Sequence, residues 1–333
     1  MSADLNLNVN SPDLNGNPSD LNVNFFDQII GNIEKVIVGK KDAVELALIA
    51  LVCGGHVLIE DLPGMGKTML ASCLAKSLDC SFGRIQFTPD LLPSDITGFN
   101  MYDMATNRQV LCAGSIMRQI VIADEINRAS PKTQSALLEA MQEGQVTIDG
   151  RTILLPSPFM VLATQNPIEF AGTYPLPESQ LDRFMLRIVM GYPTFDEEMQ
   201  ILSRHQSRGE ENGADIGAVA SAQDVLRLRR ELARVVVSDG IKQYIIDIAA
   251  ATRSHQAVDL PVSPRGSIAL LRASMGCALL HGRDYVLPDD VRRLTVSVLA
   301  HRCLLSPAAL AKETLAEDVL SGILNTLPVP LAS

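Results

Sequence analysis

The sequence lacks the features that mark a disulfide scaffold, a structural zinc site or a membrane-spanning protein. Its 333 residues include only six cysteines, with no C-x-x-C pair and no neighbouring pair of histidines. Reduced thiols, mostly buried, are therefore expected. No apolar run approaches the roughly 18 residues that a membrane-spanning helix needs, so no membrane span is expected.

Positive charge is also scarce in this sequence. Lys and Arg number 28 against 38 for Asp and Glu, which gives a net charge of −10. This balance argues against broad, sequence-independent binding to nucleic acid or anionic lipid, although it is compatible with a local basic channel. The N-terminus lacks the basic segment and apolar core of a secretory signal, so the expected location is the cytoplasm.

What the chain does contain is the composition of a globular protein, with 47% hydrophobic and 20% charged residues. Its length suffices for roughly two domains. Residues 1–24 are rich in Asn and lack aromatics, which predicts a disordered tail, with an edge strand or docking peptide as the alternative. Folding is predicted to begin near Phe25, with a core over 25–190 and a smaller helical domain over 191–333, where strand-like runs stop.

Three short apolar runs predict a parallel β-sheet in the core. They are HVLIE (56–60), IVIA (120–123) and FMVLA (159–163), and they show no alternation of apolar and polar residues. Segments with helical spacing lie between them, including one that begins at Ser130-Pro131 and ends at Gly144. Strands that alternate with helices form βαβ units, so the predicted class is α/β, with helices on both faces of the sheet.

The segment after the first of these strands has the composition of a phosphate-binding loop. It reads DLPGMGKT (61–68), between a predicted strand and a predicted helix. Its backbone N–H groups would hold the phosphates at the helix N-terminus. Lys67 would reach the β- and γ-phosphates, and the Thr68 hydroxyl would bind Mg²⁺. The predicted nucleotide-binding residues of this loop are Pro63, Gly64, Met65, Gly66, Lys67, Thr68 and Met69.

One position departs from the usual loop pattern. Asp61 stands where G-x-x-x-x-G-K-[ST] has its first glycine. Asp tolerates left-handed backbone better than most residues, so the turn is expected to survive. Its carboxylate must then point away from the phosphates.

Polar residues follow the other two predicted strands. Asp124 and Glu125 come directly after IVIA, and Asn166 follows FMVLA. Since the carboxyl ends of parallel strands meet at one edge of a sheet, these residues are expected near the phosphate loop. Asp124 would hold Mg²⁺, Glu125 would polarise the water that attacks the γ-phosphate, and Asn166 would position that water. An Asn that caps a turn before Pro167 is the alternative.

Together with these motifs, three longer segments resemble the MoxR family of AAA+ ATPases. They are ADEINRASPKTQSALLEAMQE (123–143), TQNPIEFAGTYPLPESQLDRF (164–184) and GYPTFDEE (191–198). The resemblance covers roughly residues 30–325. It implies an AAA+ αβα P-loop core with a helical lid, assembled as a homo-oligomeric ring, usually a hexamer. It also implies that ATP is bound and hydrolysed with Mg²⁺ at each subunit interface.

The resemblance implies a role for each matching residue. Arg183 resembles the arginine finger that acts on the neighbouring subunit's nucleotide, and Arg265 resembles sensor 2, which reports the phosphate from the lid side. Arg128 resembles an interface arginine of the family. For all three, a surface salt bridge is the alternative. The remaining matches are Lys67 and Thr68 to Walker A, Asp124 and Glu125 to Walker B, and Asn166 to sensor 1.

Three further segments match features of the family. Val38 and Gly39 resemble the part that packs on the adenine, with an ordinary turn before a helix as the alternative. Residues 91–111 and 145–155 occupy the places of the family's insert and its hairpin, and Asp149-Gly150 is a good hairpin turn. Residues 112–117 depart from the family pattern, which affects the return path of the insert.

The resemblance implies a chaperone-like motor that remodels or matures client protein complexes, often with a von Willebrand factor A domain partner. Two alternatives stay open. A nucleic-acid translocase fits the same fold, but the acidic balance and a hairpin whose basic residues number only Arg151 count against it. An ATP-binding scaffold with little turnover is disfavoured by Glu125 and Arg183, and Asp61 keeps it open.

Overall fold

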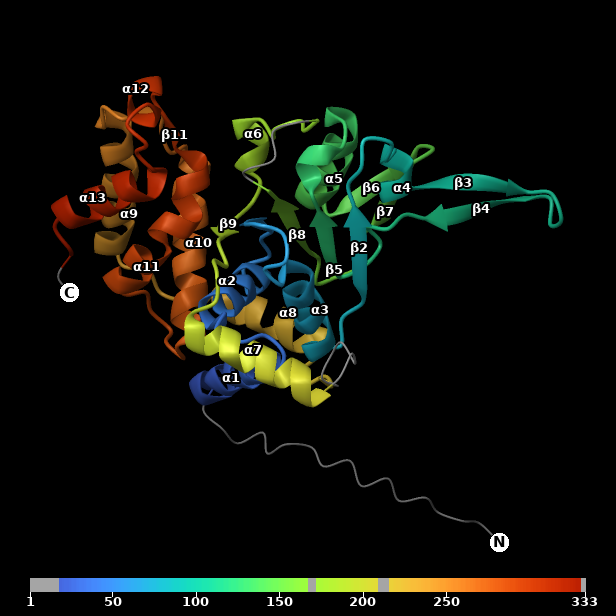
Figure 1. Cartoon of the computed structure of the whole chain (residues 1–333), viewed down its shortest axis with the longest axis horizontal. Helices are drawn as coiled ribbons and strands as arrows, with labels where there is room; N and C mark the ends of the chain where they lie inside the picture. The colour runs from blue at the N-terminus through green and yellow to red at the C-terminus, as the bar shows by residue number, and fades with distance from the viewer. Residues whose placement is uncertain (1–17, 167–171, 209–215, 331–333) are drawn as a thin grey trace, which may run out of the picture.

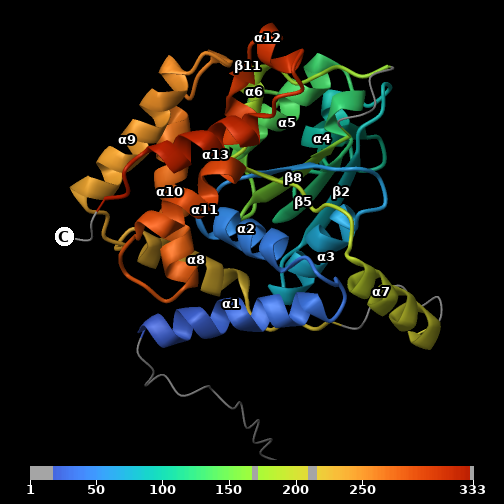
Figure 2. The same cartoon turned by 60° about the vertical axis from the view of Figure 1, so that its left-hand side comes forward.

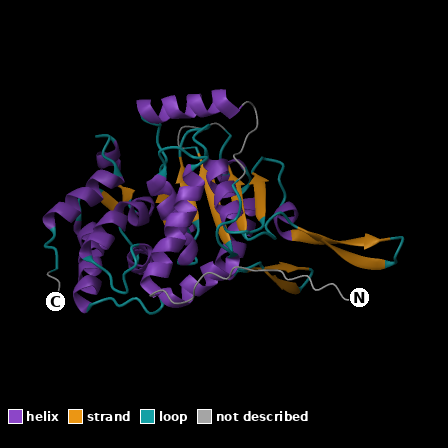
Figure 3. Ribbon diagram, turned by 90° about the horizontal axis from the view of Figure 1, so that it is seen from below, coloured by secondary structure: helices purple, strands orange, loops and turns teal. Residues whose placement is uncertain are grey.

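The computed structural model describes residues 18–166, 172–208 and 216–330. A sheet-containing core lies beside a group of helices, and a two-stranded hairpin projects from the core on the side away from those helices (Figure 1). Figure 3 shows the strands of the sheet between layers of helices. Within the described ranges, no helix is long and apolar enough to cross a membrane.

A five-stranded parallel sheet forms the centre of the core. All of its strand pairs are parallel, and every residue of β5 is buried, as a strand covered on both faces requires. The predicted parallel sheet is therefore confirmed. In spatial order its strands are β2 (Phe82–Gln86), β5 (Ile120–Asp124), β8 (Met160–Gln165), β1 (Val57–Glu60) and β9 (Leu186–Ile188).

Helices cover both faces of this sheet. Successive strand residues point to opposite sides, and both sets are apolar, so each face needs a covering layer. On one face, Ile120 and Ile122 join an apolar cluster with α2 (Lys41–Val52) and α3 (Lys67–Ser77). On the other face, Val121 packs with Leu137 and Leu138 of α5 (Pro131–Glu143). Ser130 caps α5 by accepting a hydrogen bond from the Thr133 N–H, and left-handed Gly144 ends the helix, as predicted.

The predicted start of folding is wrong, because helix α1 (Pro18–Glu34) begins before Phe25. Residues 18–24 of the predicted tail belong to this helix, and residues 1–17 lie outside the described ranges. Asn22 is buried and donates to a Glu231 carboxylate oxygen at 2.6 Å, and Phe26 is also buried. Figure 2 shows α1 beside α2 and α3. A contact between residues 209 positions apart therefore orders a segment whose composition resembles that of a disordered tail.

Two hairpins extend from the core at the predicted places. Strands β3 (Gly98–Asp103) and β4 (Arg108–Ala113) pair in the insert after the short helix α4 (Pro93–Thr97). Strands β6 (Gln145–Ile148) and β7 (Arg151–Leu154) form the second hairpin. Asp149 and Gly150 have φ values of 48° and 77°, which suit the predicted tight turn.

Helices dominate the described chain after β9, as the sequence predicts. Ser221, Ser238 and Ser263 cap three of them, and Thr194 with Glu197 makes a capping box. One short strand pair interrupts them. The elements after β7 that complete the fold are α6 (Glu178–Leu181), α7 (Phe195–Arg208), α8 (Ala222–Leu232), α9 (Asp239–Ser254), β10 (Val258–Leu260), α10 (Pro264–Leu280), α11 (Pro288–Leu299), the 3-10 helix η2 (Ala300–Arg302), β11 (Leu304–Leu305), α12 (Pro307–Leu310) and α13 (Ala316–Thr326).

Candidate functional site

The loop from Asp61 to Gly66 joins β1 to the N-terminus of α3. Gly64 and Gly66 have φ values of 84° and 83°, a left-handed conformation that residues with a Cβ rarely adopt. Gly66 is the N-cap residue of α3, so the free N–H groups of the first helical turn begin directly after the loop. This backbone has the form that an anion-binding helix start requires.

The Asp61 side chain points away from the loop opening. Its carboxylate accepts hydrogen bonds from three backbone N–H groups, those of Leu62 at 2.8 Å, Met190 at 2.8 Å and Gly191 at 2.7 Å. The side chain is buried, and it ties the loop to the segment that follows β9. Asp61 therefore has a structural role at the position where the usual pattern has glycine.

We expect Asp61→Gly, which restores the usual pattern, to destabilise the protein. The change leaves the buried Met190 N–H and the partly buried Gly191 N–H without their acceptor, a loss of about 3 kcal/mol in the free energy of unfolding. Asp61→Asn keeps one oxygen acceptor and should lose less. Urea unfolding of the three proteins, with ATP affinity measured alongside, checks this expectation. An Asp61→Gly protein as stable as the wild type, or with tighter ATP binding, would contradict the assigned role.

Lys67 begins α3 and faces several oxygen atoms. Its ammonium donates to the Asp61 backbone carbonyl at 2.6 Å. Burial lowers the pKa of Lys67, and the negative charges of Asp61, Asp124 and Glu125 partly offset that effect. A partly desolvated ammonium whose hydrogen bond within the described residues goes to a neutral carbonyl is well placed to bind an anion.

Asp124 ends β5 beside the start of α3. The Thr68 hydroxyl donates to Asp124 Oδ2 at 3.4 Å, and the Thr164 hydroxyl donates to Oδ1 at 3.3 Å. Arg84 forms an ion pair with Oδ2 at 2.8 Å. Mg²⁺ prefers oxygen ligands, and the Thr68 hydroxyl and the Asp124 carboxylate lie close enough together to bind one ion. Thr68 and Asp124 therefore fit the Mg²⁺ site that the sequence predicts.

Glu125 follows Asp124 in a strained backbone conformation, with φ 56° and ψ 50°. Its N–H donates to the Thr164 hydroxyl at 2.9 Å. Its carboxylate Oε2 accepts from Gln86 Nε2 and from the Arg128 guanidinium, each at 3.0 Å. Arg128 therefore contacts Glu125 of its own chain. Contacts from β2 and from the turn after β5 therefore fix the position of this carboxylate, and the contact from β8 fixes its backbone.

These residues line one cavity of about 400 Å³ at the carboxyl ends of the strands. Asn166, which follows β8, lines the same cavity as the predicted residues of the phosphate loop, Asp124 and Glu125. Pro167 lies outside the described ranges. Three of the lining residues, Arg84, Gln86 and Thr164, belong to no motif that the sequence predicts. The lining residues are Pro63, Gly64, Met65, Gly66, Lys67, Thr68, Met69, Arg84, Gln86, Asp124, Glu125, Thr164 and Asn166.

Val38 and Gly39 lie in the turn before α2, close to the segment that follows β9. The Lys40 ammonium donates to the Gly191 carbonyl at 2.9 Å. Gly39 has a φ of 70°, and a Cβ at this position would lie 2.0 Å from the Glu197 carboxyl carbon. The positive φ at Gly39 would strain a residue with a Cβ, and the Glu197 carboxyl group would have to move to make room for that atom.

Arg183 and Arg265 line a second cavity, of about 290 Å³, between the core and the helices after β9. Neither belongs to the lining of the cavity around Lys67. Arg183 follows the short helix α6, and Arg265 lies in the first turn of α10. The structure therefore brings the two arginines together and separates them from the phosphate loop of their own chain.

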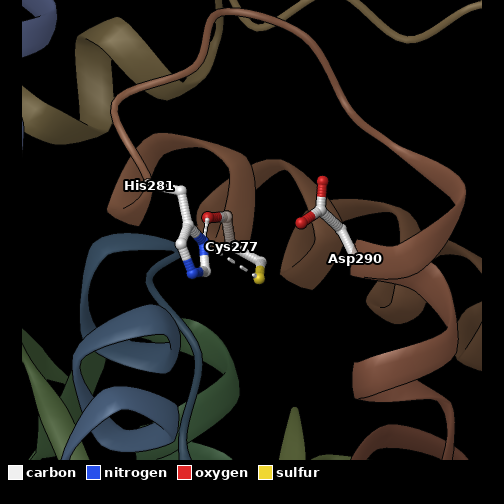
Figure 4. A group of neighbouring side chains, drawn as sticks. All are labelled: Cys277, His281 and Asp290. Carbon is white, nitrogen blue, oxygen red and sulfur yellow. Dashed lines mark hydrogen bonds between the residues drawn. The ribbon is translucent and has the colours of Figure 1, made fainter.

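A group of possible metal ligands, Cys277, His281 and Asp290, lies among the helices after β9, with ligand atoms within 4.8 Å of one another (Figure 4). Both Asp290 carboxylate oxygens accept hydrogen bonds from Arg283, at 2.7 and 2.6 Å. Burial raises the pKa of the Cys277 thiol to about 12, and His281 Nδ1 lies 2.8 Å from the Cys277 carbonyl oxygen. These contacts form a structural network between the end of α10 and the start of α11.

Comparisons with known proteins agree with this arrangement. Residues 56–186 match the ATPase family associated with various cellular activities (AAA), and residues 250–323 match the AAA lid domain. A crystal structure from Cytophaga hutchinsonii, described as a candidate ATPase, superposes with a TM-score of 0.87 at 37% identity and covers 94% of this chain and 97% of that one.

Relatives of similar length show the family. The uncharacterised protein YeaC of Bacillus subtilis is 52% identical over 92% of this chain and 95% of its own length. Chaperone MoxR1 of Mycobacterium tuberculosis is 40% identical over 92% and 83%, and protein MoxR of Paracoccus denitrificans is 32% identical over 96% and 100%. The chain, with its AAA+ core and helical lid, therefore belongs to the MoxR family of AAA+ ATPases.

Proposed function

We propose that this protein is a Mg²⁺-dependent ATPase that converts ATP to ADP and phosphate. The observation that carries the proposal is the convergence of Lys67, Thr68, Asp124, Glu125 and Asn166 on one cavity. These side chains lie at or directly after the carboxyl ends of three strands of the parallel sheet, at the edge where such sheets bind ligands. Membership of an ATPase family supports the same activity.

Binding of the nucleotide is assigned to the loop from Pro63 to Met69 and to the turn at Val38-Gly39. The N–H groups at the start of α3 hold the phosphates, and the Lys67 ammonium exchanges the Asp61 carbonyl for phosphate oxygens. Val38 and Gly39 contact the adenine. Thr68 and Asp124 hold Mg²⁺, which when bound withdraws charge from the phosphate oxygens.

Glu125 and Asn166 are assigned to the hydrolytic step. Glu125 accepts a proton from the attacking water as the water oxygen bonds to the γ-phosphorus and the bond to the bridging oxygen breaks. Asn166 holds this water in line with that bond through its side-chain amide. Hydrogen bonds from Gln86 and Arg128 orient the Glu125 carboxylate before ATP arrives, and the Thr164 hydroxyl holds its backbone.

Arg183 and Arg265 are assigned to the ATP of the neighbouring subunit. Both lie in the cavity between core and lid, away from their own phosphate loop. A guanidinium supplied across an interface stabilises the charge that develops on the transferred phosphoryl group. This assignment requires head-to-tail contacts that close into a ring, and a hexamer is the proposed size.

The biological role that we propose is chaperone-like remodelling of client protein complexes in the cytoplasm. A relative named as a chaperone supports it. The β3–β4 hairpin exposes apolar side chains, with Met104 90% exposed, and we assign client contact to it and to the β6–β7 hairpin. A partner with a von Willebrand factor A domain belongs to the same proposal, as does a boundary between core and lid near residue 190.

ATP turnover measured with and without a Mg²⁺ chelator tests the proposed activity. We expect turnover in Mg²⁺ and a loss of roughly 100-fold or more in the chelator, since a bound ion contributes several kcal/mol to transition-state stabilisation. Asp124→Asn should show a similar loss in Mg²⁺, and Asp239→Asn, a change at a side chain that is 97% exposed, should not. Equal turnover with and without Mg²⁺ would contradict the proposal.

A further inference from the structure

Arg302 is a buried lid residue whose guanidinium reaches into the core. It lies in η2 and is 8% exposed. Its Nε donates to Asp182 Oδ1 at 2.7 Å, and its terminal nitrogens donate to the carbonyls of Asp182 at 3.2 Å, Phe184 at 2.6 Å and Met185 at 3.0 Å. A single lid side chain therefore binds both sides of the peptide that carries Arg183.

The Asp182 carboxylate extends this contact to the helix that carries Arg265. Its second oxygen, Oδ2, accepts from the Ser263 hydroxyl at 3.4 Å. Ser263 is the N-cap residue of α10, two positions before Arg265. Asp182 thus joins Arg302 on one oxygen and the start of α10 on the other. Arg183 and Arg265 lie in one cavity because this cluster connects the segments that carry them.

The chemistry of this contact requires arginine. A guanidinium presents several N–H groups in one plane, so it can satisfy a carboxylate and the three core carbonyls of residues 182, 184 and 185 together, whereas a lysine ammonium is a point charge with three donors. Burial lowers the pKa of Arg302, and the Asp182 carboxylate acts in the opposite direction. Burying a guanidinium costs folding free energy unless all of its N–H groups find acceptors. The acceptors that Arg302 finds fix the position of the segment from Asp182 to Met185.

We propose that Arg302 and Asp182 are positioning residues that hold Arg183 and Arg265 as one unit, aimed at the γ-phosphate of the neighbouring subunit's ATP. This inference rests on the proposed function. Because Arg302 belongs to the lid and Arg183 to the core, a movement of the lid moves both guanidinium groups together. The lid of one subunit then controls hydrolysis in the next subunit, through contacts that do not involve its own nucleotide.

Mixed rings distinguish two groups of variants. A subunit with a defective Arg183 segment still offers an intact phosphate loop, whereas Lys67→Ala offers an intact Arg183 segment. We expect Arg302→Lys rings to lose roughly 10- to 100-fold in turnover while they keep wild-type ATP affinity, because part of the finger's contribution is lost. Mixing Arg302→Lys with Lys67→Ala should restore turnover, and mixing it with Arg183→Ala should not.

Two further variants keep the test independent of folding. Asp182→Asn, at a partly exposed side chain, should complement Lys67→Ala in the same way if Arg302→Lys does not fold. Arg293→Lys is the matched control, because Arg293 pairs with Glu45 of α2 and so joins lid to core elsewhere. Its rings should keep turnover within about twofold of the wild type, because lysine keeps the charge opposite Glu45 and Arg293 lies outside the cavity that holds Arg183 and Arg265.

Three results would overturn the inference. They are no rescue of Arg302→Lys and Asp182→Asn by Lys67→Ala in rings shown to be mixed, rescue by Arg183→Ala, or an equal loss in Arg293→Lys. If Arg183→Ala complements Lys67→Ala while the Arg302 and Asp182 variants do not, only the positioning role is wrong. If that first pair also fails to complement, the proposed action across the interface fails, and the positioning role fails with it.

Discussion

Replacing Glu125 with glutamine should leave ATP bound and rings assembled while it abolishes turnover. Glutamine is nearly isosteric, and its amide oxygen can still accept the hydrogen bonds from Gln86 and Arg128. It cannot accept a proton from water. Loss of a positioned general base lowers the rate roughly 10²- to 10⁴-fold. ATP binding, ring mass and single-turnover hydrolysis of the purified variant measure these three properties separately.

The matched control for this change is Glu313→Gln, which alters an exposed carboxylate after α12 that lines neither the nucleotide cavity nor the cavities around Arg183. It should hydrolyse ATP at the wild-type rate. A Glu125→Gln protein that turns over ATP at the wild-type rate would show that another group activates the water. A protein that no longer binds ATP would show that Glu125 acts in binding.

Rings made only of Arg183→Ala subunits should be inactive, and so should rings made only of Lys67→Ala subunits. Mixed rings of the two should hydrolyse ATP, because a Lys67→Ala subunit supplies its intact Arg183 to an intact neighbouring phosphate loop. An arginine finger contributes roughly 10³- to 10⁵-fold in rate. Random mixing in equal amounts makes about one interface in four productive, so about a quarter of the wild-type turnover is expected.

The mixing experiment depends on rings that contain both variants, which native mass measurement establishes. Mixed rings with no more turnover than either parent would place Arg183 outside the neighbour's active site. High turnover in Arg183→Ala rings alone would show that the contacts of this arginine are structural. Each result is independent of whether Glu125 is the base.

Much of the nucleotide cavity is predictable from the sequence because local motifs encode it. The glycines and Lys67 of the loop, and Asp124 and Glu125 at the end of an apolar run, lie next to the elements that position them. Gln86 and Arg84 were missed because β2 is an edge strand with a mixed pattern, and its central residues do not form an unbroken apolar run. Thr164 was missed because its role depends on contacts with β5.

Other features depend on contacts between distant parts of the chain. The acceptance of Asp at position 61 depends on N–H groups of residues 190 and 191, which lie about 130 positions away. The early start of α1 depends on Glu231 in α8. Arg302 belongs to no motif in the sequence, and its contacts with residues 182–185 appear only when lid and core are placed together. Local pattern therefore predicts the phosphate loop better than the lid–core junction.

The measurement that tests the central claim most directly is ATP turnover per subunit as a function of subunit concentration, with ring mass followed in the same samples. If each ATP is cleaved between two adjacent copies, turnover per subunit falls toward zero as dilution converts rings to single chains, while single chains still bind ATP. Full turnover per subunit at concentrations where only single chains are present would contradict the account.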